Sequence, residues 1–141
     1  MNIYGFYNKP EELDDYKTSL TTVPAVAYGH AIHSNNPFPA GEAAISKSAQ
    51  YSYLYAQYVL RGRFIKGEDA IAQDPNVAYS YCSAVLDGPF PKGEDAIARN
   101  TRTAYDYARY VLRGPFPKGE AAINKSPTLA DSYRDFIEGL D

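Results

Sequence analysis

The chain has 141 residues, of which 45% are hydrophobic and 22% charged, with a formal net charge of −3. This balance excludes an intrinsically disordered chain, and no apolar run approaches the roughly 20 residues that a membrane-spanning helix needs. A single cysteine, Cys82, excludes an internal disulfide framework. The opening MNIYGFYNKP lacks the basic and apolar parts of a secretory signal, so we expect a cytoplasmic protein without membrane contact.

Two elements are predicted before any repetition begins. Met1–Pro10 is expected to be an extended segment that covers one end of the fold. Glu11–Leu20 is predicted to be a helix, because acids fill its first turns and Leu13, Tyr16 and Leu20 share one face.

A unit of 26 residues then occurs four times without a gap, at Phe38–Arg63, Phe64–Pro89, Phe90–Pro115 and Phe116–Asp141. A period of this length is typical of solenoid proteins, in which one supersecondary unit stacks on the next. We therefore predict a single all-α repeat domain over residues 1–141, a short α-solenoid of helix–turn–helix repeats.

A degenerate copy of the repeat precedes the four full copies. The segment VPAVAYGH at Val23–His30 matches DPNVAYSY at Asp74–Tyr81, although the alignment slips by one residue. We therefore predict that residues 1–37 form an N-terminal cap and a degenerate opening unit.

Each full copy predicts two helices. Position 1 is Phe, position 4 is Gly, position 5 is Glu and positions 7 and 8 are Ala-Ile, which indicates a short helix A of about two turns. An N-capping residue at position 11 begins helix B, of about 13 residues. The capping residues are Ser48, Asp74, Asn100 and Ser126. Gly62, Gly88 and Gly114 are expected to end helix B in the left-handed conformation of a C′ residue.

Residues that recur on helix B predict its buried side. Positions 15, 18, 19 and 22 share one helical face and are Ala104, Tyr107, Ala108 and Val111 in the third copy. Small side chains at positions 15 and 19 let neighbouring backbones approach closely, while tyrosine and valine fill the seam between repeats.

Positions 13, 17, 20 and 24 of helix B change from copy to copy, and we call these residues the variable face. They are Gln50, Leu54, Gln57 and Arg61, then Asn76, Ser80, Ser83 and Asp87, then Arg102, Asp106, Arg109 and Arg113. Repeat proteins usually bind through the surface that stacking leaves free. We therefore predict that Arg61, Asp87, Arg102, Asp106, Arg109 and Arg113 contact a partner. For the position 24 residues, a surface ion ladder between repeats is an equal alternative.

The last copy departs from the pattern. Asp131, Arg134 and Glu138 replace the tyrosine, alanine and leucine of positions 16, 19 and 23. An outward face without a neighbour turns polar, so we expect the fourth copy to be an end unit.

Several residue types invite a chemical role, but a structural role is the stronger hypothesis for each. The acids at position 5 are expected to complement the dipole of helix A and to accept a tyrosine hydroxyl. The tyrosines at position 18 are expected to be core residues that do not stack on bases. His30 and His33 lack a third metal ligand, and Cys82 replaces a buried alanine. We therefore predict no enzyme, no metal and no cofactor.

The charge of the copies alternates, at +2, −3, +2 and −2. A continuous basic track for nucleic acid would look different, which makes a nucleic-acid partner the weaker hypothesis. We favour a non-catalytic module that binds a protein. A nucleic-acid binder centred on the basic third copy, and a nucleotide or small-ligand sponge with tyrosine-lined grooves, are the alternatives.

The string FPxGExAI…AYxYAxxVLxG, present from Phe90 to Gly114, resembles a short helical repeat of small proteins from tailed bacteriophages and other large DNA viruses. The resemblance covers Phe38–Asp141. It implies a phage product that acts in the host cytoplasm on a host protein, such as a defence or regulatory protein that it inhibits.

Overall fold

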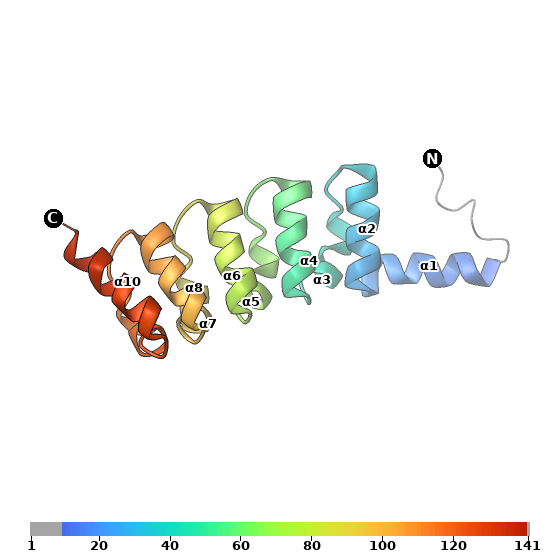
Figure 1. Cartoon of the computed structure of the whole chain (residues 1–141). Coiled ribbons are helices and arrows are strands. Elements are labelled where there is room, and N and C mark those ends of the chain that lie inside the picture. Colours follow the sequence, from blue (N-terminus) through green and yellow to red (C-terminus); the bar gives the residue numbers. More distant parts are fainter. Residues whose placement is uncertain (1–9, 141) are drawn as a thin grey trace.

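The structure is a computed structural model that describes residues 10–140, with side chains from Asp14 onward. The described part of the chain is all-α, with no strand, and confirms the predicted solenoid of helix–turn–helix repeats. Figure 1 shows the second helices of successive units side by side in one row, with the short first helices packed at their lower ends. The predicted covering role of Met1–Pro10 falls on residues 1–9, which lie outside the described part.

The opening unit consists of α1 (Pro10–Thr22) and α2 (Pro24–Ser34). Helix α1 extends away from the lower end of α2, roughly perpendicular to α2 and along the direction of the row (Figure 1). It includes the predicted Glu11–Leu20 helix, and Leu20 is buried with 8% of its surface exposed. Of the predicted apolar face, the side chain of Leu13 lies outside the described part.

Helix A of each full repeat is one 3₁₀ turn followed by a short α-helix. These pairs are η2 (Pro39–Gly41) with α3 (Glu42–Ile45), η4 (Ile65–Gly67) with α5 (Glu68–Ile71), η6 (Pro91–Gly93) with α7 (Glu94–Ala98), and η8 (Pro117–Gly119) with α9 (Glu120–Ile123). The glycine at the end of each 3₁₀ turn lies against the preceding helix B. A Cβ on Gly93 would lie 2.6 Å from Phe90 Cδ2 and 3.1 Å from Ala78 Cβ, so only glycine fits there.

Helix B begins as an α-helix in every repeat and becomes a π-helix in the first three. The segments are α4 (Ala49–Leu54) with η3 (Tyr55–Leu60), α6 (Pro75–Tyr81) with η5 (Cys82–Leu86), α8 (Thr101–Asp106) with η7 (Tyr107–Leu112), and α10 (Pro127–Glu138), which is α-helical throughout. All four predicted N-caps are confirmed, because each side chain accepts a backbone N–H from the first turn.

The prediction for the helix ends is wrong by one residue. The left-handed residues are Arg61, Asp87 and Arg113, with φ of 54°, 49° and 54°, and the glycine that follows each has a negative φ. The left-handed residue is the one that directly follows the helix, whether the helix ends as an α-helix, as at Asn35 after α2, or in a π turn, as at Arg61 after η3. In this π turn the N–H groups of both Arg61 and Gly62 bond to the carbonyl of Ala56.

The same π turn explains why the opening unit aligns with a slip of one residue. Helix α2 is α-helical to its end, and Asn36 donates to the carbonyl of Ala31, five residues earlier. In the full repeats the corresponding glycine donates to a carbonyl six residues earlier. The repeats therefore hold one more residue than α2 between the same two structural points, and the π turn accommodates it.

The core follows the recurring positions, as predicted. Tyr55, Tyr81 and Tyr107 are fully buried, as are the isoleucines of position 8 and the small residues of position 19. Each of these tyrosines packs its ring against the Phe of the next repeat, with centroids 4.9 to 5.2 Å apart. Position 22 is half-buried and contacts the same cluster. No helix in the described part is long and apolar enough to cross a membrane.

Candidate functional site

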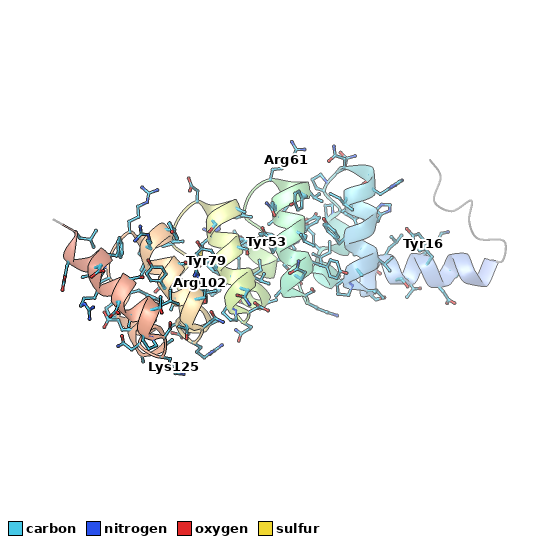
Figure 2. All side chains as sticks on the ribbon, viewed as in Figure 1. Tyr16, Tyr53, Arg61, Tyr79, Arg102 and Lys125 are labelled. Atoms are coloured by element: carbon cyan, nitrogen blue, oxygen red, sulfur yellow. The ribbon has the colours of Figure 1, made fainter. Side chains whose placement is uncertain are left out.

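The variable face lies on the surface of the solenoid. Its residues are exposed or half-buried in all three repeats, whereas the residues at positions 15, 18 and 19 of the same helices are buried. Figure 2 shows Tyr53 and Tyr79 between successive B helices and Arg102 on the lower part of α8. Sequence reasoning therefore separated the buried side of helix B from the free side.

The structure adds position 21 to this surface. Tyr58 and Tyr110 expose 50% and 58% of their area, although neither was predicted as a site residue. Both stand in a π turn, whereas Phe136, at the same position of the wholly α-helical α10, is half-buried. The exposure thus depends on a helix type that the sequence pattern did not reveal. π turns are rare and occur often at functional sites.

The position 24 residues lie apart from the helical face on which they were predicted. Arg61, Asp87 and Arg113 occupy the left-handed turns that follow helix B, and Figure 2 shows Arg61 projecting from such a loop. None of the three forms an ion pair with another among the described residues, so the predicted ion ladder is not observed. Ion pairs between repeats instead join helices A, through Lys66 to Glu42, Lys92 to Asp69 and Lys118 to Asp95.

Arg102 and Asp106 are joined within α8. The Nε of Arg102 lies 3.0 Å from Oδ2 of Asp106, one helical turn further along. The other carboxylate oxygen, Oδ1, is buried and has no hydrogen-bond partner among the described residues. This oxygen is an exception, because buried acceptors are almost always paired in folded proteins.

Arg109 is held by aromatic rings from two repeats. Its guanidinium carbon lies 5.7 Å from the ring centroid of Tyr110 and 5.5 Å from that of Phe136, and Nη1 donates to the hydroxyl of Tyr105 at 3.4 Å. Both rings are within range of a cation–π interaction. Arg109 forms no ion pair with any described carboxylate, so its charge is oriented but not neutralised.

These side chains line a groove between the third and fourth B helices, with a volume of about 630 Å³. We call it the Arg109 groove, and its main lining residues are Arg102, Tyr105, Arg109, Tyr110, Leu129 and Phe136. A volume of this size suits a small ligand or a few side chains of a protein segment. Of the six residues predicted to bind a partner, the structure brings Arg102 and Arg109 together here, with Asp106 paired to Arg102.

Asp87 and Arg113 line a separate cavity of about 520 Å³ nearer the ends of the helices. Tyr110 contributes to both cavities, and Cys82 is among the residues that line the second one. Burial raises the pKa of the Cys82 thiol to about 12, which keeps it protonated and unreactive near neutral pH. The thiol is therefore part of the packing.

The remaining candidates have structural roles. The acids of position 5 each accept the hydroxyl of the position 18 tyrosine of the same repeat, as predicted. The tyrosine rings are buried and therefore cannot stack on bases. His30 occupies the equivalent place in the opening unit, where its ring lies 4.6 Å from that of Phe38.

No protein-family model, no curated protein and no solved structure matches this chain. The functional argument therefore rests on the geometry of its own residues.

Proposed function

We propose that this protein is a non-catalytic binding module that holds a protein partner on the variable face of its B helices. The observation that carries this proposal is the position of Arg109, an unneutralised cation held between Tyr110 and Phe136 on the exposed side of the row. Arginine and tyrosine are the side chains most enriched among residues that dominate protein–protein affinity.

The fixed orientation of the Arg109 side chain favours this role. The guanidinium of Arg109 is already positioned by two rings and one hydrogen bond, so binding would cost little side-chain entropy. The resemblance to phage repeat proteins adds a host protein as the class of partner, in the host cytoplasm, and inhibition of a defence or regulatory protein as the outcome.

Site-specific photo-cross-linking tests the proposal. A photoreactive phenylalanine analogue is placed at Tyr58 or Tyr110 on the exposed side, and at Ile65 in η4 as the control. Ile65 is 69% exposed, so the control position is at least as accessible as the two test positions.

In extracts of the natural host, we expect the same protein to be cross-linked from Tyr58 or Tyr110 and not from Ile65. The complex should survive nuclease treatment. Equal cross-linking from all three positions, or a cross-linked species that nuclease removes, would contradict the proposal.

A further inference from the structure

We propose that the Arg109 groove binds an acidic segment of the partner protein, in an extended conformation, through carboxylates that reach Arg102 and Arg109. This inference rests on the proposed function and adds to it the place of contact and the chemistry of the partner. Three observations carry it: the charge in the groove, the spacing of the arginines, and the carboxylate of Asp135, which lines the groove with them.

The side chain that is held most firmly in the groove, Arg109, is positively charged. Arg109 has aromatic rings on two sides and a hydroxyl beside it, but it forms no ion pair with a carboxylate of the described residues. An arginine that is oriented in this way presents its planar fork of N–H groups to a carboxylate at little entropic cost. A carboxylate on the partner would supply the one interaction that Arg109 lacks.

Arg102 can take part without losing its contact to Asp106. Only Nε of Arg102 bonds to Asp106, which leaves the terminal N–H groups of the guanidinium for a second carboxylate. Arg102 therefore offers N–H donors to a bound carboxylate while it stays paired with Asp106.

The spacing of the arginines favours an extended segment. Seven residues separate Arg102 and Arg109 along helix B, which corresponds to about 10 Å of helical rise. An extended chain in the polyproline II conformation covers this distance with about three residues, and its three residues per turn place side chains three positions apart on the same side. We therefore expect acids at every third position of the bound segment, which is the arrangement that our probe peptide reproduces.

The carboxylate in the groove favours protein over nucleic acid. Asp135 lines the groove together with Arg102 and Arg109. A polyphosphate chain carries no donor for this carboxylate and would be repelled by it. A protein segment has a backbone N–H at almost every residue and can satisfy both kinds of group.

The test uses the full chain and two labelled probes at equal length, with binding measured by fluorescence anisotropy at low and moderate salt. The first probe is a 12-residue peptide with glutamate at every third position and glycine or serine elsewhere. The second is a 12-nucleotide single-stranded oligothymidine. We expect the peptide to bind at least about tenfold more tightly than the oligonucleotide at the higher salt concentration.

Two charge reversals provide matched variants in the same repeat. Arg109→Glu changes the groove, and Arg99→Glu makes the same charge change at an exposed residue just after α7, which forms no ion pair among the described residues. We expect Arg109→Glu to weaken peptide binding about tenfold or more and Arg99→Glu to change it less than about twofold. Circular dichroism confirms that both variants are folded.

Each other outcome overturns the inference. Tighter binding of the oligonucleotide would establish nucleic acid as the occupant. An equal loss of peptide affinity in the two variants would show that net charge, and not the groove, controls binding. No binding of the peptide, together with cross-linking of a protein from Tyr110, would refute the acidic segment while leaving the proposed function intact.

Discussion

The hydroxyl of Tyr81 donates a hydrogen bond of 2.6 Å to Glu68 and accepts one of 3.1 Å from the N–H of Phe64. The same three groups meet in every full repeat, so that each position 18 tyrosine ties helix A, helix B and the start of the repeat together. One hydroxyl thus satisfies a buried N–H and a carboxylate at the same time. This relationship explains why tyrosine, and not phenylalanine, recurs at position 18.

Removing this hydroxyl should destabilise the fold. In Tyr107→Phe the N–H of Phe90 and the carboxylate of Glu94 lose their shared partner, and we expect a loss of about 1–3 kcal/mol in the free energy of unfolding. Tyr110→Phe removes a hydroxyl from a side chain that is 58% exposed and should change stability by less than about 0.5 kcal/mol. Urea unfolding followed by circular dichroism measures both. Similar losses in the two variants would refute the proposed role of the hydroxyl.

The same tyrosines should make the protein sensitive to base. Burial, together with the hydrogen bond to a carboxylate, raises the pKa of Tyr55 and of Tyr81 to about 12. Because the folded-state pKa is raised, this contribution to stability is complete below the ordinary tyrosine pKa of 10.0 and is lost as pH rises toward 12.

Ultraviolet absorbance of phenolate and the helical circular dichroism signal, recorded on one pH series, test this prediction. We expect part of the phenolate signal to appear only together with the loss of helix. Complete ionisation of all 14 tyrosines while the helical signal is unchanged would contradict it.

Low pH should destabilise the fold through protonation of Glu68, which is 2% exposed. Burial raises the pKa of Glu68. Hydrogen bonds from Arg63 and Tyr81, together with the charge of Arg63, lower this pKa by a larger amount, so the net shift is downward. A lowered folded-state pKa means that this stability is present above the ordinary glutamate pKa of 4.5 and is lost as pH falls through the folded-state value.

Removal of the Arg63 guanidinium is expected to reverse the direction of the shift in the pKa of Glu68. Nε and Nη2 of Arg63 bond to Oε2 and Oε1 of Glu68 at 2.9 and 2.8 Å. In Arg63→Ala, the upward effect of burial on the pKa of Glu68 is opposed only by the tyrosine hydroxyl and by more distant charges. The midpoint of acid unfolding should therefore move to higher pH. Arg99→Ala, at an exposed arginine without an ion pair among the described residues, is the control and should leave the midpoint unchanged.

The left-handed turns allow a stabilising substitution. Arg113 has φ of 54°, a conformation that costs residues with a Cβ about 1–2 kcal/mol relative to glycine. Arg113→Gly should therefore raise the free energy of unfolding by up to about 1 kcal/mol, after allowance for the greater freedom of glycine in the unfolded chain.

Gly114→Ala is the matched variant for this test. A Cβ at Gly114 meets only the carbonyl of Leu112 at 3.9 Å, and its φ is negative, so alanine should fit without strain. We expect a change of less than about 0.5 kcal/mol, measured by thermal or urea unfolding. A large loss in Gly114→Ala with no gain in Arg113→Gly would instead assign the left-handed position to the glycine.

Much of the fold could be predicted because its determinants recur. A tyrosine, an isoleucine and a small residue at fixed positions in each copy identify the seam, since stacking imposes the same environment on every repeat. The N-caps were equally predictable, because Ser48 or Asp74 bonds to an N–H only two or three residues away. The site was predicted in part: Arg102, Asp106 and Arg109 lie on the exposed side of helix B, whereas Arg61, Asp87 and Arg113 lie in the turns beyond it.

The missed features lie at the end of helix B. Tyr110 is exposed within the π turn of η7, and the left-handed residue, Arg113, directly follows that turn. The slip of one residue against the opening unit is the sequence signal that indicates such an insertion. An alignment shows that a residue is extra, but not whether a loop or a helical turn accommodates it.

By itself, the sequence determined the period, the two helices of each unit and the side of helix B that is buried. These properties depend on hydrogen bonds and side-chain contacts over short stretches of chain, and the chain repeats them. Only the tertiary structure decided the position of Arg109, because one of the two rings that hold it, Phe136, comes from the next repeat. That contact requires two helices to pack at a particular distance and rotation, and no local pattern of residues contains this information.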